Sequence, residues 1–316
     1  MKKFLLIYIS IFISFTLACS ASKPQKESSV NSTPEKKDQT EKVDENLVKQ
    51  IETIASEAKG KVGVEAVVFE TGESVSLNRK DHFPMQSVYK LPIAMAVLRQ
   101  IDEEKLKLDQ KVRVEKSDYV RRGQHSPLRD KNPNGVETNV EELLRLAVSE
   151  SDGSASDVLV KLAGGFENIQ SFLKEIKVDE LTVLDTEKQI GSDWETQYRN
   201  WATPDGALEL LRAVYEKRGL SEQSSQLLLK ILTATTTGPK RLKGLLPQNS
   251  VVAHKTGTSG SRDGITAATN DIGIITLPNG KHLGIAVFVS DSPADEPTRE
   301  AVIAKIAKAA WDNWSR

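Results

Sequence analysis

The chain has 316 residues, enough for one or two domains with a sizeable core. Its formal net charge is −1, and it has no basic patch interleaved with aromatic residues, so its composition argues against a nucleic-acid partner. It has a single cysteine, which leaves no internal disulfide, and its four histidines lack the spacing of metal ligands. We therefore expect a small-molecule partner and no metal site.

The beginning of the chain predicts export rather than a folded core. Residues 1–18 have a short basic start, an apolar stretch and a small residue before a cleavage point, which describes a signal peptide. Cleavage before Cys19 with a lipid on its sulfur would give a membrane-tethered lipoprotein, whereas ordinary cleavage after Ala18 would not. Residues 19–45 are rich in Ser, Lys, Glu and Pro and predict a disordered tether. We expect a periplasmic or extracellular protein.

The folded part is expected to span residues 46–316 and to open with a helix and a hairpin. The stretch "NLVKQIETIASEAKG" places apolar residues at helical spacing and ends in Gly60, which favours an amphipathic helix with a C-terminal stop. Residues 62–69 are rich in β-formers. The turn "ETGES" then leads into a second short strand, "VSLN".

Ser87 stands three residues before Lys90, where a polar and aromatic run changes into an aliphatic helix. In one interpretation Ser87 is an N-cap and Lys90 lies in a solvent-facing first turn, which are common places for both residue types. In the other, the helix begins at or before Ser87, and both side chains point into the same space. Residues 91–98 are apolar on nearly all sides, which favours burial. A lysine buried there could act as a base beside a nucleophilic hydroxyl.

The remaining elements complete an α+β fold. Helices separated by polar loops follow, and strands return at "SVVAHKT", "AATNDIGIITL" and "HLGIAVFVSD" before a last amphipathic helix. We predict an α/β sandwich with a five-stranded antiparallel sheet, built from about residues 46–86 and 233–316 and flanked by the terminal helices. An all-helical part, at about residues 87–232, is inserted. A cleft between two such parts is a natural place for a site.

Three later stretches carry further candidate residues. Ser151, Asp152 and Gly153 stand at a helix start, where such residues are ordinary caps. Glu187 lies in a long polar loop, in which most glutamates are simply solvated. The run "KTGT" at 255–258 ends an apolar strand, and a glycine within a strand often marks the close approach of a ligand. Its lysine and glycine are in the wrong order for a Walker phosphate loop, and no histidine lies in a GxSxG elbow. The base for any acyl transfer would therefore be a lysine or a carboxylate.

Taken in order, these motifs resemble those of the class A serine β-lactamases: "SVYK" at 87–90, "SDG" at 151–153, Glu187 in its loop and "KTGT" at 255–258. The resemblance covers nearly all of the expected folded part. Gln86, the long loop around Glu187 and "AHKTGTSG" are most similar to the extended-spectrum, cephalosporin-hydrolysing enzymes. The resemblance implies the β-lactamase/transpeptidase-like fold.

The resemblance implies a serine acyl-enzyme mechanism with no metal or organic cofactor. Ser87 would attack the β-lactam carbonyl after losing its proton to Lys90 or, through a water, to Glu187. The backbone N–H groups of Ser87 and Thr258 would form the oxyanion hole. Glu187 would then activate the water that releases the acyl group.

The resemblance also implies how a substrate is held. Ser151 would pass a proton to the leaving β-lactam nitrogen. The substrate-binding residues would be Lys255, Thr256, Gly257 and Thr258, with the first two on the substrate carboxylate. The partners implied are penicillin and cephalosporin antibiotics, to which the enzyme would give resistance, and we expect it to act as a monomer.

Three positions depart from the family pattern. Gly153 stands where the family usually has an asparagine that positions the substrate amide and the lysine. Gly191 stands four residues after Glu187, where commoner members have an asparagine that helps to hold the deacylating water. His125 precedes "SP", where an aromatic residue often lines the site entrance. These departures put the strength of acylation and the holding of the water in question.

Two other functions remain open on the sequence alone. A penicillin-binding D,D-peptidase or a β-lactam sensor shares the serine and lysine motifs but keeps its acyl group for long times, and Glu187 argues against both. The other open function is that of a catalytically inactive adaptor lipoprotein on the same fold. The presence of Ser87, Lys90, Ser151 and Lys255 together with Glu187 argues against it, because a protein without catalysis needs none of them.

Overall fold

The computed structural model describes residues 44–316. The expected signal peptide, Cys19 and residues 19–43 of the expected tether lie outside the described residues. Within residues 44–316 no helix combines the length and the apolar character needed to span a bilayer.

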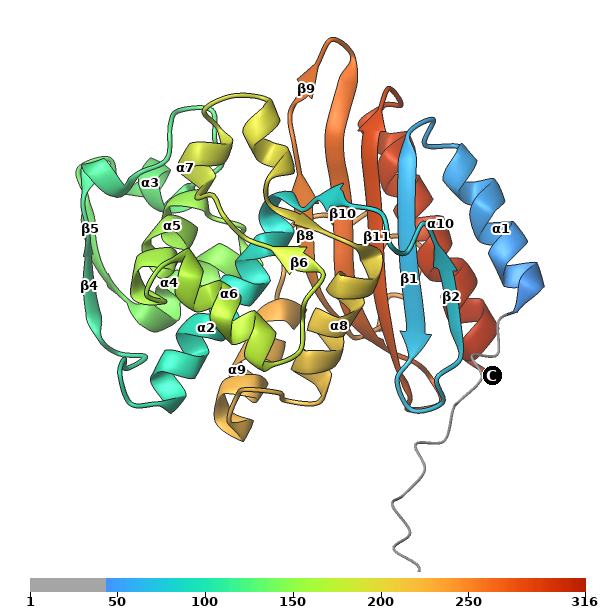
Figure 1. Cartoon of the computed structure of the whole chain (residues 1–316), viewed down its shortest axis with the longest axis horizontal. Coiled ribbons are helices and arrows are strands. Elements are labelled where there is room, and N and C mark those ends of the chain that lie inside the picture. Colours follow the sequence, from blue (N-terminus) through green and yellow to red (C-terminus); the bar gives the residue numbers. More distant parts are fainter. Residues whose placement is uncertain (1–43) are drawn as a thin grey trace, which may run out of the picture. The chain divides into compact units, whose positions relative to one another are not determined.

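The expected five-stranded antiparallel sheet is present (Figure 1). Its order is β2-β1-β11-β10-β8, and every neighbouring pair is antiparallel. The five strands are β1 (Lys61–Val68), β2 (Ser74–Leu77), β8 (Val252–Thr258), β10 (Ile265–Thr276) and β11 (His282–Ser292). A sixth strand of two residues, β9 (Ser261–Arg262), pairs with β10. Because β1 pairs with β11, the two ends of the folded chain share one sheet.

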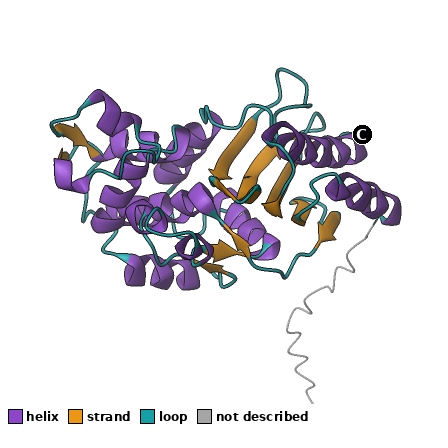
Figure 2. Ribbon diagram, turned by 90° about the horizontal axis from the view of Figure 1, so that it is seen from above, coloured by secondary structure: helices purple, strands orange, loops and turns teal. Residues whose placement is uncertain are grey.

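The terminal helices cover one face of this sheet (Figure 2). They are α1 (Glu45–Ser56) and α10 (Glu296–Trp314). The Asp44 side chain caps α1 by accepting hydrogen bonds from two backbone N–H groups of its first turn. The apolar sides of both helices and the facing residues of the sheet form one buried core. This arrangement confirms the layer of terminal helices that the periodicity predicts.

A second core lies on the opposite face of the sheet and extends into the helical part. Its main helices are α2 (Lys90–Asp102), α4 (Val140–Ser149), α5 (Gly153–Leu162), α6 (Phe166–Glu175), α8 (Pro204–Tyr215) and α9 (Glu222–Thr233). Residues 90–98 of α2 are all buried, and the helix packs against α4, α5, α6 and α9. Although α8 lies within the stretch expected to be the inserted helical part, it packs on β1, β10 and β11. Helical periodicity shows which side of α8 is apolar but not what that side contacts.

The remaining elements of the described residues are short. They are β3 (Phe83–Pro84), η1 (Gln86–Tyr89), β4 (Lys111–Val114), η2 (Lys116–Asp118), α3 (Pro127–Lys131), β5 (Val136–Asn139), β6 (Leu181–Thr182), α7 (Glu187–Ile190), η3 (Glu195–Tyr198) and β7 (Trp201–Ala202). The strand β7 pairs with both β3 and β6. Asn200 closes the long loop that precedes β7, because its side chain accepts from the Leu184 and Asp185 N–H groups and donates to the Asp185 carbonyl. The ends of that loop are thus fixed next to the entry into η1.

Candidate active site

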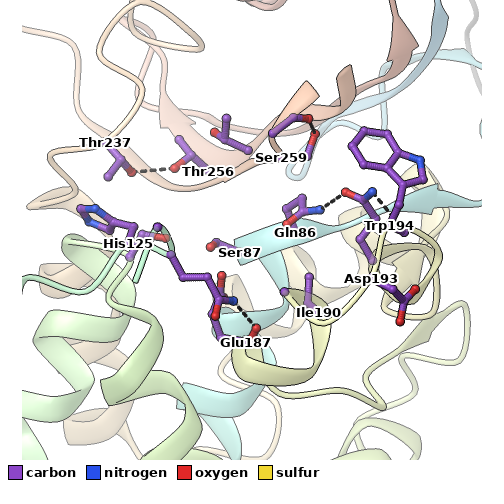
Figure 3. A pocket seen from close by; sticks show the side chains of 17 residues that line it. Gln86, Ser87, His125, Glu187, Ile190, Asp193, Trp194, Thr237, Thr256 and Ser259 are labelled. Atoms are coloured by element: carbon purple, nitrogen blue, oxygen red, sulfur yellow. Dashed lines mark hydrogen bonds between the residues drawn. The ribbon is translucent and has the colours of Figure 1, made fainter. Parts of the chain in front are cut away.

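A pocket of about 550 Å³ is lined by residues from the sheet and from the helical part. Five of the eight site residues expected from the sequence line it: Ser87, Ser151, Glu187, Thr256 and Thr258. Figure 3 shows Thr256 and Thr237 on one side of Ser87, and Glu187 and Ile190 on the other. The other three expected residues, Lys90, Lys255 and Gly257, are buried.

Ser87 sits in η1, immediately before α2, so the helical stretch begins before the serine as one interpretation of the sequence requires. Gln86 has a φ of 47°, in the left-handed region of the backbone that residues other than glycine rarely adopt. Its side-chain amide donates to Gln197 Oε1 at 2.7 Å. A Cβ at Gly257 would lie 2.2 Å from the Met85 carbonyl oxygen. The glycine of "KTGT" is therefore needed because any side chain there would clash with the backbone that leads into Ser87.

Lys90 is 1% exposed, which excludes a place in a solvent-facing first turn. Its Nζ donates to the Ser151 carbonyl oxygen at 2.7 Å and lies 3.2 Å from Glu187 Oε2. Lys90 thus lies buried between two of the other expected site residues, with its Nζ in contact with both.

Glu187 begins α7, and the preceding Thr186 forms a capping box with Gln189. Its carboxylate accepts from the Tyr89 hydroxyl at 2.7 Å and pairs with Lys90. Burial raises the pKa of Glu187, but the charge of Lys90, the hydrogen bonds from Tyr89 and Lys90, and the charge of Lys255 together leave it below its ordinary value. The Glu187 side chain is therefore an ionised carboxylate that lines the pocket, rather than a solvated loop residue.

Asp157, on α5, holds the backbone of the Glu187 loop. Its two carboxylate oxygens accept from the N–H groups of Glu187, at 2.7 Å, and of Lys188, at 3.1 Å. Burial raises the pKa of Asp157 to about 6, against the lowering effect of these two hydrogen bonds. The sequence shows Asp157 only as one polar residue in a helix.

Ser151 joins the two buried lysines. Its φ of 58° lies in the left-handed region. Its carbonyl accepts from Lys90, and its hydroxyl oxygen accepts from Lys255 Nζ at 2.9 Å. Lys255 also donates to the Thr256 carbonyl at 3.0 Å, and burial, followed by the charge of Lys90, lowers its pKa well below the ordinary value. The neighbouring Asp152 is an N-cap of α5, as its capping interpretation predicts.

The sheet side of the pocket carries hydroxyl groups and a buried guanidinium. The hydroxyl oxygens of Thr237 and Thr256 lie 2.6 Å apart. Arg241 is 3% exposed, and its Nη2 donates to the Thr258 hydroxyl at 2.8 Å. This side can bind an anionic group of a ligand through hydroxyl donors, with the charges of Lys255 and Arg241 behind them. Thr237 and Arg241 lie in the segment between α9 and β8, and nothing in their spacing along the sequence singles out either residue.

A sequence profile of the beta-lactamase enzyme family matches residues 46–314. The chain belongs to this family. It is 42% identical over 270 residues to the β-lactamase VEB-1 of Pseudomonas aeruginosa, and the aligned region covers 85% of this chain and 90% of that protein. It is 43% identical over 265 residues to the extended-spectrum β-lactamase PER-1 of the same organism, covering 84% of this chain and 86% of that protein.

The fold is also that of solved β-lactamases. The crystal structure of a β-lactamase from Chitinophaga pinensis DSM 2588 is 45% identical, with a TM-score of 0.83, and the match covers 85% of this chain and 99% of that one. The α+β fold and the class A serine β-lactamase predicted from the motifs are therefore confirmed.

In this β-lactamase the two glycines that depart from the family pattern are closely surrounded. A Cβ at Gly153 would lie 2.7 Å from Glu187 Cγ, and a Cβ at Gly191 would lie 2.5 Å from Gln124 Nε2. Neither position has room for an asparagine as the side chains now stand. His125 lines the pocket, as expected for an entrance residue, and its Nε2 lies 2.8 Å from the Glu150 carbonyl oxygen.

The sequence does not reveal which other side chains reach the pocket. Those that line it besides the expected residues include Gln124, Ile190, Asp193, Trp194, Gln197 and Ser259. Most of them lie on irregular segments, where hydrophobic periodicity carries no information. Within residues 44–316 no three histidine, cysteine, aspartate or glutamate side chains are arranged to hold a metal ion.

Proposed function

We propose that this enzyme hydrolyses the β-lactam amide bond of penicillins and cephalosporins through an acyl-enzyme on Ser87, and thereby gives antibiotic resistance. The observation that carries the proposal is that Ser87 and the ionised Glu187 carboxylate line one pocket, with Lys90 buried against Glu187 and Ser151. A hydroxyl nucleophile needs a base within reach, and this arrangement supplies one for each half of the reaction.

In the first half, Ser87 Oγ bonds to the β-lactam carbonyl carbon and the ring C–N bond breaks. The serine proton leaves toward the Lys90–Glu187 pair: either to Lys90, once Lys90 has given its own proton to Glu187, or through a water to the Glu187 carboxylate. The N–H groups of Ser87 and Thr258 stabilise the developing oxyanion. The leaving nitrogen takes the hydroxyl proton of Ser151, and the proton taken from Ser87 then returns to the Ser151 oxygen, so that Glu187 is ionised again before the second half.

Lys255 supports this proton transfer from Ser151. Its Nζ donates to the Ser151 hydroxyl oxygen, so it stabilises the negative charge that develops there as the proton leaves. The hydroxyl groups of Thr256 and Thr258, which line the pocket, bind the substrate carboxylate, with Lys255 adding charge from behind. Gly257 lets the strand that carries these residues approach the backbone before Ser87.

In the second half, Glu187 takes a proton from a water, whose oxygen attacks the acyl carbonyl. The ester bond to Ser87 breaks, and the serine oxygen regains a proton. This step separates the enzyme from penicillin-binding proteins and sensors that share the serine and lysine motifs. The lowered pKa of Glu187 supports the proposal, because the base is ionised at neutral pH.

The substrate range and the location are parts of the same proposal. Similarity to the extended-spectrum enzyme PER-1 supports turnover of cephalosporins. The signal-like residues 1–18 support export, followed either by lipidation of Cys19 or by ordinary cleavage. We also propose that the enzyme acts as a monomer. Fractionation of cells expressing the parent and Cys19→Ala separates the two forms, since only lipidation would hold the parent on the membrane.

Steady-state hydrolysis by the purified enzyme tests the function. We expect turnover of nitrocefin, benzylpenicillin and a cephalosporin antibiotic by the parent, and a loss of about 10³-fold or more in Ser87→Ala. Ser192→Ala, which changes an exposed serine in the Glu187 loop, is the matched control and should keep the parental rate. A parent that acylates but does not turn over would instead be a penicillin-binding protein or a sensor.

A further inference from the structure

The backbone of Glu187 is held at both of its polar groups. Its N–H donates to Asp157, and its carbonyl accepts a hydrogen bond from the side-chain amide of Gln124. Gln124 lies in the loop between η2 and α3, and it lines the pocket. The direction of the Glu187 side chain therefore depends on groups from two separate segments of the helical part.

The side chain of Gln124 is itself held in place by its neighbours. Its Oε1 accepts from the Arg121 N–H at 3.1 Å, which leaves the NH₂ group directed at Glu187. The Arg121 guanidinium donates to the Gly191 carbonyl at 2.9 Å. The Gln124 amide also fills the space that a side chain at residue 191 would take. Both ends of α7 are thus bound by one loop, and Gly191 provides the room.

A side chain at residue 153, where the family usually has an asparagine, would find no room beside Glu187. A Cβ there would lie 2.7 Å from Glu187 Cγ, 3.2 Å from the His125 carbonyl oxygen and 3.3 Å from Val120 Cγ1. The methylene groups of Glu187 occupy the space beside Gly153. The amide that reaches this side of the site comes from Gln124.

We propose that Gln124 is a positioning residue for deacylation, which acts by holding the Glu187 carbonyl and so aims the Glu187 carboxylate at the hydrolytic water. This inference rests on the proposed function of Glu187. Deacylation needs a water held by the Glu187 carboxylate, whereas in acylation the serine proton can also leave through Lys90, which contacts Glu187 directly and needs no such water. Loss of the Gln124 donor should therefore slow deacylation more than acylation.

Two substitutions remove the donor in different ways. Gln124→Met keeps the length of the side chain and has no N–H group. Gln124→Glu keeps the shape, cannot donate when ionised, and donates again through its O–H once protonated, around pH 4 to 5 for an ordinary glutamate. Gln223→Glu makes the same chemical change at an exposed position on α9 and is the matched control.

Pre-steady-state kinetics with nitrocefin and a slowly hydrolysed cephalosporin measures both steps. We expect deacylation to fall about tenfold in both Gln124 variants at pH 7, the size expected for one lost hydrogen bond, with acylation changed by less than about threefold. Intact-mass analysis should show more acyl-enzyme at steady state. Relative to the parent, the defect of Gln124→Glu should shrink as the pH falls toward 4.5, while that of Gln124→Met stays constant.

The burst amplitude counts folded, active enzyme, so loss of folding is measured separately from loss of rate. Parental deacylation in Gln124→Met would overturn the inference, and so would a pH-independent defect in Gln124→Glu. Slower acylation with normal deacylation would place Gln124 on the substrate instead. A parent without turnover would overturn the proposed function, which is a different result.

Discussion

Asp157 is a carboxylate buried at a place where its ionisation is costly. It is 6% exposed, and it holds the N–H groups at the start of α7. Burial raises its pKa to about 6, which means that the folded protein binds a proton at Asp157 more tightly than the unfolded chain does. The stability that this proton contributes is fully present below the ordinary pKa of 3.8 and is lost as the pH rises through about 6.

Asp157→Asn should remove this pH dependence. Asparagine does not ionise, so the difference in unfolding free energy between variant and parent should shift in favour of the variant by about 2 kcal/mol between pH 4 and pH 7. Urea unfolding of both proteins at pH 4, 5.5 and 7 measures this difference in unfolding free energy. A constant difference across this range would show that Asp157 does not titrate there.

Arg241 connects three elements beside the pocket. Its guanidinium donates to the carbonyl oxygens of Gly257 on β8, at 3.1 Å, and of Asn270 on β10, at 3.0 Å. It also pairs with Glu300 on α10, with 3.2 Å between Nε and Oε1. A buried cation that satisfies two carbonyls and a carboxylate holds the strand of the "KTGT" residues against the rest of the sheet.

Arg241→Met should destabilise the fold by about 2 to 4 kcal/mol, because it leaves buried acceptors and the Glu300 carboxylate without their donor. Urea unfolding at pH 7 gives the change in free energy. Arg262→Met is the control, since it breaks an exposed ion pair with Glu195 and should cost less than about 1 kcal/mol. Equal losses in the two variants would contradict the role given to Arg241.

At the scale of the whole molecule, the sequence predicts the layers better than the contacts between them. The strands and terminal helices carry clear periodicities, and the apolar run after Lys90 correctly indicates a buried helix. The sheet contacts of α8, and the approach of Gln124 to Glu187, depend on how distant segments pack. In the sequence, Gly153 and Gly191 stand out only as positions where the family usually has an asparagine. The structure shows that neighbouring groups occupy both spaces.

Residues 44–316 form two cores, one on each face of the sheet. A protein that starts at residue 44 should therefore fold, with kcat/KM for nitrocefin within about twofold of the exported protein. A protein that starts at residue 61 lacks α1, exposes the core beneath it and should not fold. Failure of the 44–316 protein to fold would show that earlier residues contribute to stability.

The most direct test of the mechanism is intact-mass analysis and peptide mapping of Glu187→Gln after exposure to a cephalosporin. We predict an acyl adduct that accumulates on the peptide containing Ser87, while the parent and the control Glu195→Gln, changed at an exposed glutamate of the same loop, return to their free mass. An adduct elsewhere, or a parent that keeps its adduct as long as Glu187→Gln does, would contradict the account.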